Sequence, residues 1–286
     1  MIQKHDWVGY FFISLFGIPF VIFNILPILF GAYISFNEWG IFGDPDWVGF
    51  DNYINLFIDR YAYTAFENVI LYAVLIVPCV TIFGFFAALF VNNGWILSGL
   101  SRTFFFSPYA VAASVVGLIW VWLLDTQYGL INSYLNVLGI ENIPWLTSTN
   151  WVVIGVSIAS IWWDLGLAFI LFLAGLQDIP KDLLDSSKTD GANPIQRLIY
   201  VIVPYMRPVI SMVITLQLIA TLRIFSQILV MTSGGPAGAS SSPIFYIYTT
   251  AIENQLFGYS SAVSMVLFIF ILTLTLLMRF TIRERF

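Results

Sequence analysis

The sequence predicts an all-α, polytopic membrane protein with six transmembrane helices, and three observations support this fold class. Of its 286 residues, 59% are hydrophobic and only 9% are charged, whereas about a quarter of the residues in soluble domains are charged. Several apolar runs reach the roughly 20 residues that a helix needs to cross the hydrocarbon core of a bilayer. The third observation is a charged segment, residues 177–208, that separates the fourth apolar run from the fifth.

Six apolar runs predict the transmembrane helices in order along the chain. The first run contains Pro19 and Pro27, which membrane helices tolerate as kinks, and it is too long for the apolar core of a signal peptide. A further segment, residues 245–257, is amphipathic and is expected to lie at the membrane interface. The six predicted spans are residues 8–36, 66–91, 103–124, 151–176, 208–232 and 259–280.

Lysine and arginine residues predict the orientation of these spans, because such residues concentrate in cytoplasmic loops. With the N-terminus inside, nine of the 11 lysines and arginines fall in cytoplasmic segments. Arg60 falls outside, and Arg223 falls within the predicted fifth span. We therefore expect both termini and the charged segment to be cytoplasmic.

Local signals in the charged segment predict two short amphipathic helices joined by a glycine turn. Asp178 is expected to cap the first helix, whose first turn contains Pro180. Gly191 suits the left-handed conformation that ends a helix. Asn193, which a proline follows, is typical of the cap of a second helix, residues 194–200.

The charged segment also carries a spaced motif. Residues 185–187 (DSS) are followed after three residues by Gly191, and after nine more by residues 201–204 (VIVP). This pattern resembles the EAA loop of permeases of binding-protein-dependent ABC transporters, in which EAA, a glycine and I-x-L-P have the same spacing. Gly191 and the final proline match, whereas aspartate replaces glutamate and two serines replace the alanines. Residues 190–192 (DGA) resemble the form typical of the sugar-importing branch.

Four further segments resemble the sugar-importing permeases in the expected order. They are residues 47–53 (WVGFDNY), 129–132 (GLIN), 232–236 (TSGGP) and 258–262 (GYSSA). The first and third of these point to the first permease of the maltose-type or glycerol-phosphate-type importers. Because the matches run from residue 47 to residue 262, the resemblance covers most of the chain.

The resemblance implies the fold, the partners and one functional site. Residues 1–286 would form a single transmembrane permease domain of the type I ABC importer fold, with residues 177–208 as its cytoplasmic coupling loop. The implied function is ATP-driven import of a carbohydrate or sugar derivative by alternating access, in the cell membrane of a prokaryote. The implied partners are a second permease in a heterodimer, an ABC ATPase dimer that holds ATP and magnesium, and an extracytoplasmic solute-binding protein. The expected ATPase-coupling residues are Leu183, Leu184, Asp185, Ser186, Ser187, Asp190, Gly191, Ala192 and Pro204.

Polar residues at membrane depth predict a second site. Ionisable groups inside the bilayer are costly and usually face partners or a cavity. Asp164 and Arg223 could form a salt bridge between two spans, or they could line a path for a sugar, with aromatic rings stacking on its faces. The expected residues of this substrate path are Asn68, Trp163, Asp164, Gln217, Arg223, Phe225 and Gln227.

Composition excludes several other classes of function. One cysteine and one histidine cannot build a typical zinc site, and the chain has no phosphate-binding GxxxxGK[ST] loop. It also lacks the basic patch that nucleic acid requires, and no catalytic constellation indicates a membrane enzyme. A secondary transporter that works without an ATPase remains the alternative, although the charged segment would then be unexplained.

Overall fold

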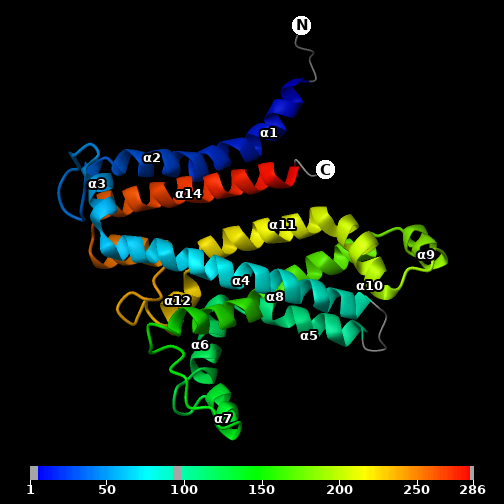
Figure 1. Ribbon diagram of the computed structural model, residues 1–286. Helices are drawn as coiled ribbons and strands as arrows, with labels where there is room; N and C mark the ends of the chain where they lie inside the picture. The colour runs from blue at the N-terminus through cyan, green and yellow to red at the C-terminus, as the bar shows by residue number, and fades with distance from the viewer. Residues whose placement is uncertain (1–5, 93–97, 284–286) are drawn as a thin grey trace. The chain divides into compact units, whose positions relative to one another are not determined.

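The computed structural model describes residues 6–92 and 98–283, which form α-helices joined by loops and one short strand pair (Figure 1). The chain divides into two compact units. The first contains the residues up to Tyr63 and Tyr246–Phe270; the second contains Thr64–Phe245 and the residues from Ile271 onward. Within the described residues, five helices are long and apolar enough to cross a membrane, or six spans if one bent pair counts as one. The all-α polytopic fold is therefore confirmed.

The first unit contains one long apolar helix at its start. A π-helical turn lies within this helix, between Pro19 and Pro27, and the helix runs beside the first part of α14 (Figure 1). The elements of this unit are α1 (Asp6–Phe20), η1 (Val21–Ile25), α2 (Leu26–Ile34), β1 (Asn37–Glu38), β2 (Asp46–Trp47), α3 (Asp51–Ile58), η3 (Thr249–Glu253) and the start of α14 (Phe257–Arg283).

The antiparallel β1–β2 pair is fixed by a buried asparagine. The side-chain amide of Asn52 donates to the carbonyl of Ser35 (3.0 Å) and to that of Asn37 (2.9 Å). Asn37 in turn donates to the carbonyl of Tyr33 (2.6 Å). Backbone carbonyls that leave a helix need such partners when they are buried, so Asn52 holds the turn that follows the first span.

Asp59 joins three parts of the first unit. Its carboxylate accepts hydrogen bonds from the hydroxyls of Tyr246 and Tyr259, and from the backbone amides of Tyr61 (2.8 Å) and Ala62 (3.3 Å). Burial of the carboxyl disfavours its charge, but these hydrogen bonds outweigh burial and lower the pKa of Asp59. The bonds to the two amides also explain why α4 (Arg60–Asn92) begins at Arg60, six residues before the predicted second span.

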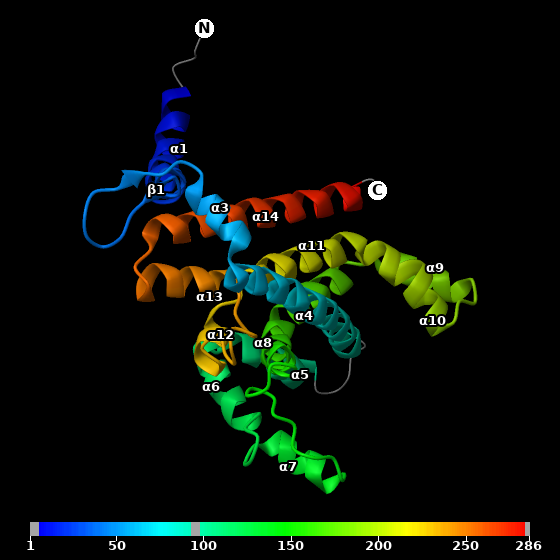
Figure 2. The ribbon, with the colours of Figure 1, turned by 60° about the vertical axis from the view of Figure 1, so that its left-hand side comes forward.

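The second unit is built around α8 (Val152–Gln177). This helix packs against α5 (Ser98–Ala110), α6 (Ala113–Leu123), α11 (Val203–Leu222) and α12 (Ser226–Met231). Figure 2 shows α9 and α10 at one end of this unit, far from α12. Its other elements are most of α4, α7 (Leu130–Val137), α9 (Lys181–Thr189), α10 (Pro194–Arg197), η2 (Leu198–Ile202), the first residues of α13 (Pro243–Tyr248) and the end of α14.

The predicted third span is bent rather than straight. Helices α5 and α6 meet at an angle of 98°, because Ala112 takes an extended conformation. The indole nitrogen of Trp163 donates to the carbonyl of Val111 (2.9 Å) and so satisfies a backbone group at the bend. A bend at membrane depth is tolerated where neighbouring side chains supply such partners.

The prediction that the fifth span covers residues 208–232 is wrong at both ends. A single apolar helix, made of α10, η2 and α11, runs through Pro194–Leu222, so the second short helix of the charged segment is its first part. The π-helical turn precedes Pro204, where the amide of Val203 donates to the carbonyl of Leu198, and it accommodates a proline that lacks its own amide donor. Arg223 lies at the end of the helix and not inside it.

The Asp59 contacts predict a pH-dependent stability. Because its folded-state pKa is lowered, the Asp59 carboxylate stabilises the fold above its unfolded-state pKa of about 3.9, and this contribution is lost as the pH falls through the folded-state value. Asp59→Asn should lower the free energy of unfolding at pH 7 by about 1 kcal/mol, since the site is only partly buried.

Thermal unfolding of the purified transporter checks this expectation between pH 7 and pH 3. The difference in Tm between the wild type and Asp59→Asn should become smaller below about pH 4. Asp46→Asn, at an exposed position of β2, is the matched control. An unchanged Tm of Asp59→Asn at pH 7 would contradict the stabilising role.

Candidate functional site

The charged segment forms a helix, a turn and the start of a second helix. Gly191 follows α9 with a φ of +78°, as its predicted role requires. Asn193 and Gln196 form a reciprocal capping box, with hydrogen bonds of 2.8 and 2.9 Å, which confirms the predicted second cap. The predicted cap at Asp178 is wrong: Asp178 ends α8, and Pro180 occupies the N-terminal cap position of α9 without a side-chain hydrogen bond.

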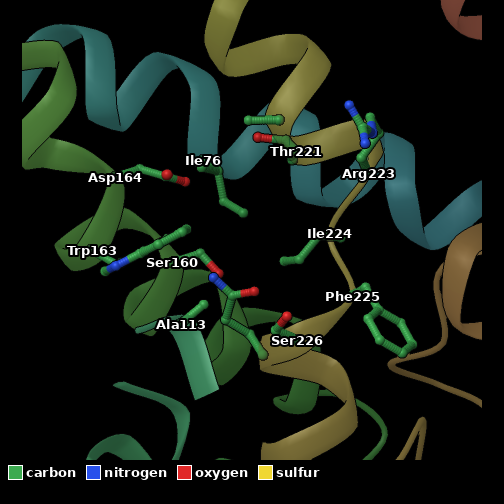
Figure 3. Close-up of a pocket in the computed structure, with 12 residues that line it drawn as sticks. Ile76, Ala113, Ser160, Trp163, Asp164, Thr221, Arg223, Ile224, Phe225 and Ser226 are labelled. Atoms are coloured by element: carbon green, nitrogen blue, oxygen red, sulfur yellow. The ribbon is translucent and has the colours of Figure 1, made fainter. Parts of the chain in front are cut away.

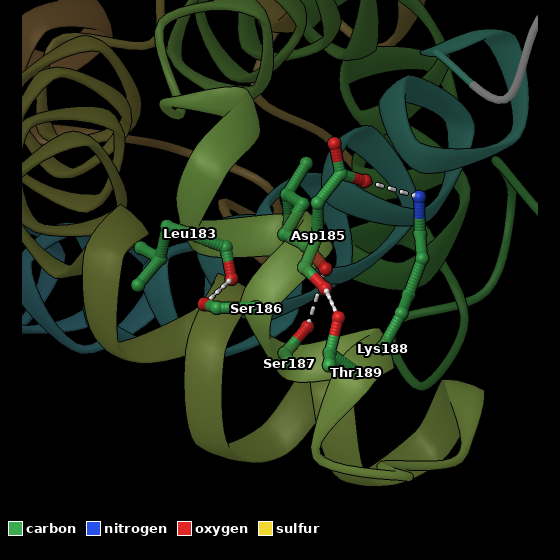
Figure 4. A network of polar contacts seen from close by, with 7 residues as sticks. Leu183, Asp185, Ser186, Ser187, Lys188 and Thr189 are labelled. Atoms are coloured by element: carbon green, nitrogen blue, oxygen red, sulfur yellow. Dashed lines mark hydrogen bonds and ion pairs between the residues drawn. The ribbon is translucent and has the colours of Figure 1, made fainter.

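Asp185 pairs with its own helix. Its carboxylate lies 2.7 Å from the ammonium group of Lys188, one turn later, and both side chains are exposed (Figure 4). The hydrogen bond and the charge of Lys188 lower the pKa of Asp185. The carboxylate is therefore ionised and accessible, and Lys188 orients it. Because both groups are exposed, another cation could replace Lys188 as its partner.

The two serines that replace the alanines of the EAA pattern bond to the backbone of α9. Ser186 donates to the carbonyl of Leu183 (3.1 Å) and Ser187 to that of Leu184 (2.7 Å), as Figure 4 shows. Ser187 is buried, and α9 packs against η2. A small residue at position 187 thus suits the close approach of these two segments.

Apolar side chains remain exposed on this segment. Leu183 is 39% exposed and Ile195 is 67% exposed. Of the other predicted coupling residues, Asp190 and Gly191 are exposed, whereas Leu184, Ala192 and Pro204 are half-buried. Ile195 was not among the coupling residues predicted from the sequence. An apolar residue in the first turn of a helix that begins in a charged segment could have indicated it.

A second candidate site is a cavity of about 240 Å³ within the second unit (Figure 3). This volume lies just below the roughly 300–1,000 Å³ typical of pockets for drug-sized ligands, so it suits a small solute. Helices α4, α6, α8, α11 and α12 all contribute to it. Its lining residues are Ile76, Ala113, Ser160, Trp163, Asp164, Ala220, Thr221, Arg223, Ile224, Phe225, Ser226 and Gln227.

Four buried polar groups line the cavity. Ser160, Asp164, Thr221 and Gln227 are each at least nine-tenths buried. Within the described part of the chain, the hydroxyl oxygen of Thr221 has no hydrogen-bond partner. Buried polar atoms are normally satisfied, so the Thr221 hydroxyl is available to a bound polar solute.

Aromatic rings and two charged residues complete the lining. Trp163 packs against Tyr109 with ring centroids 5.4 Å apart and ring planes tilted by 31°. Phe225 lies near the opposite end of the labelled residues (Figure 3). Asp164 and Arg223 both line the cavity, but among the described residues they form no ion pair with each other. Of the two possibilities for this pair, the salt bridge between two spans is therefore not formed.

The cavity brings together most of the predicted substrate-path residues. Five of them line it: Trp163, Asp164, Arg223, Phe225 and Gln227. Gln217 lies one turn before Thr221 on α11, buried and outside the lining. Asn68 is also outside, because its amide donates to loop carbonyls at Gly238 and Ser241. Ser160 and Thr221 were missed; Ser160 precedes Asp164 by one helical turn, a spacing that places both on one face.

Among the described residues, no group of three histidine, cysteine, aspartate or glutamate side chains is placed to hold a metal ion. The arrangement supplies hydrogen-bonding groups and aromatic surfaces. It is suited to bind a polar solute.

Proteins of known role resemble this chain over most of its length. The permease protein SmoG of the sulfoquinovosyl glycerol transport system of Agrobacterium fabrum is 31% identical, with 78% of this chain and 72% of SmoG covered. UgpA of the sn-glycerol-3-phosphate transport system of Yersinia pestis is 32% identical, with 81% of this chain and 79% of UgpA covered. MalF of the trehalose/maltose transport system of Thermococcus litoralis is 30% identical, with 90% of this chain and 87% of MalF covered.

A solved structure has the same fold. It is a chain of a bacterial ABC transporter involved in the import of the acidic polysaccharide alginate, with a TM-score of 0.87, 22% identity, and 98% of this chain and 96% of that chain covered. Residues 80–283 also match the family model described as binding-protein-dependent transport system inner membrane component. The chain therefore belongs to this family: it is a multi-pass inner-membrane permease of an ABC importer, and nucleotide is bound by its ATPase partner.

Proposed function

We propose that this permease moves a carbohydrate or a sugar derivative into the cytoplasm by alternating access. The observation that carries this proposal is the cavity among α4, α6, α8, α11 and α12, where buried hydroxyl, amide and carboxyl groups adjoin aromatic rings. Sugars present hydroxyls around their edge and apolar faces above and below, and such a lining complements both. The transport systems of the similar permeases are named for trehalose or maltose, sulfoquinovosyl glycerol and sn-glycerol-3-phosphate.

The complete importer would contain three kinds of partner. A second, similar permease would form a heterodimer with this chain, an ATPase dimer would bind on the cytoplasmic side, and a solute-binding protein would deliver substrate from outside. In support, a similar solved structure is an alginate ABC transporter in complex with an alginate-bound periplasmic protein. The distribution of lysine and arginine supports both termini and the charged segment being cytoplasmic.

The charged segment would be the contact with the ATPase. A helix that binds in a groove needs exposed apolar residues flanked by charges, and Leu183 and Ile195 are exposed beside Asp185 and Lys188. Asp185 would leave Lys188 and pair with a basic residue of the ATPase. Because the two groups are solvent-exposed, this exchange would cost little free energy.

A double substitution in the charged segment tests this coupling. Proline cannot adopt the positive φ of Gly191, and Asp185→Lys reverses the exposed charge. Gly191→Pro combined with Asp185→Lys should lower substrate-stimulated ATP hydrolysis by about tenfold or more, which corresponds to about 1.4 kcal/mol of lost docking free energy. The measurement uses the complete importer in proteoliposomes.

Gly139→Pro is the matched control for the coupling test, because Gly139 also has a φ of +78° but lies in another loop. This control should hydrolyse ATP within about twofold of wild type, a change below about 0.5 kcal/mol. Normal assembly and transport by the double variant would refute the coupling role.

Substitutions in the cavity test the substrate proposal. Thr221→Val removes the unpartnered hydroxyl with little change of shape, and Gln227→Ala removes a buried amide. Each should raise the KM for uptake by about two- to tenfold, the effect of losing one hydrogen bond to the substrate. The measurement is uptake of labelled maltose, trehalose and glycerol 3-phosphate by proteoliposomes with the cognate binding protein.

Thr215→Val is the control for the cavity test. Thr215 lies on the same helix, but its hydroxyl donates to the carbonyl of Ser211 (2.8 Å) and does not line the cavity. Uptake of a sugar with the same KM in Thr221→Val, Gln227→Ala and wild type would exclude the cavity as its binding site.

A further inference from the structure

The cavity is lined in part by a break between two helices. Helix α11 ends at Leu222 and α12 begins at Ser226. The three residues between them, Arg223, Ile224 and Phe225, form the helix break, and each lines the cavity (Figure 3). The conformation of this break therefore decides where the Arg223 and Phe225 side chains lie.

A buried hydroxyl holds the helix break in place. Ser242 is fully buried, and its hydroxyl donates to the carbonyl of Ile224 (2.6 Å). The same oxygen accepts from the backbone amide of Phe245 (3.2 Å). Ser242 is thus the hydrogen-bonded link between the helix break and the start of α13.

Ser242 is the last residue of the Gly/Ser loop, residues 233–242, and this loop is bound to α4. The amide of Asn68 donates to the carbonyls of Gly238 (3.3 Å) and Ser241 (3.1 Å). The hydroxyl of Tyr72, one turn later on α4, donates to the carbonyl of Ser240 (3.0 Å). Asn68 and Tyr72 are both buried, so the loop is anchored to a transmembrane helix.

Aromatic packing connects the same parts. The rings of Phe225 and Phe245 have centroids 6.4 Å apart. Phe245 also covers Gly234, where a Cβ would collide with its ring and where φ is +76°. The Gly/Ser loop therefore contacts the helix break through Ser242 and, by way of Phe245, through Phe225.

We infer that Ser242 is a positioning residue for the substrate cavity: with the Gly/Ser loop anchored on α4 by Asn68 and Tyr72, its hydroxyl fixes the helix break that carries Arg223 and Phe225. The inference rests on the proposed role of the cavity in substrate passage. It also assigns Asn68 a role that acts through the loop and not through contact with substrate.

The test measures the accessibility of the cavity directly. Ser226 lines the cavity beside the break, and the only native cysteine of the chain is Cys79. Ser226→Cys is placed in a Cys79→Ser chain within the complete importer, and its alkylation by a small maleimide is timed without sugar. Adding Ser242→Ala should speed alkylation by about tenfold, because one buried hydrogen bond no longer holds the break.

Ser241→Ala is the matched control. Ser241 is the adjacent buried serine, and its hydroxyl makes only a 3.5 Å contact with the carbonyl of Ser242. Its alkylation rate should stay within about twofold of the parent, a change below about 0.5 kcal/mol. Equal alkylation rates for Ser242→Ala and Ser241→Ala overturn the inference.

If Ser242→Ala does not assemble, Asn68→Ala replaces it. An alkylation rate of Asn68→Ala equal to that of the parent then also overturns the inference.

Uptake kinetics separate a positioning role from a general loss of structure. Ser242→Ala should raise the KM for the transported sugar by about tenfold while the maximal ATP hydrolysis rate stays within about twofold. An unchanged KM with a lower maximal rate overturns the inference. If alkylation at position 226 changes but Thr221→Val and Gln227→Ala leave sugar uptake unaltered, the positioning role stands and the assignment of the cavity to sugar fails.

Discussion

The fold depends on satisfying backbone hydrogen bonds wherever the chain leaves a helix. Inside or beside a bilayer, an unpaired carbonyl or amide costs several kcal/mol, and this chain meets the demand with buried asparagines. Asn52 donates to two carbonyls after the first span and Asn68 to two in the Gly/Ser loop. Asn132 donates to the carbonyl of Thr126, before α7, and to that of Ile143, after α7. Each asparagine thereby fixes one connection between helices.

This constraint explains which parts of the fold were predictable. Apolar runs predicted six spans, which agrees with the described residues if the bent α5–α6 pair counts as one span. Glycine and capping signals predicted the turn at Gly191 and the cap at Asn193. The bend after Val111 and the break near Ile224 were not predictable, because neither residues 111–112 nor residues 223–225 contain a glycine or a proline. Both depend on distant partners, the indole of Trp163 and the hydroxyl of Ser242, that no local pattern reveals.

The candidate site was predictable in type but not in every member. Ionisable and aromatic residues at membrane depth indicated Trp163, Asp164 and Arg223, which do line one cavity. The same rule also selected Asn68, which instead satisfies loop carbonyls. Polarity at depth alone does not distinguish a lining residue from one that holds a loop.

The alternative of a secondary transporter is overturned by membership of the binding-protein-dependent permease family.

One continuous helix links the two candidate sites. The 29 residues of Pro194–Leu222 form a single apolar helix, roughly 43 Å long, which begins at the Asn193 cap in the charged segment and ends at the helix break. If the proposed coupling role of this segment holds, a displacement at its first turn would be carried along the helix toward the wall of the cavity. Because a packed helix moves largely as a rigid element, the least constrained place for that motion to be absorbed is the non-helical break, where Ser242 provides a hydrogen bond to Ile224. The position of the cavity wall at the end of this helix would then depend on how firmly the Gly/Ser loop holds this break.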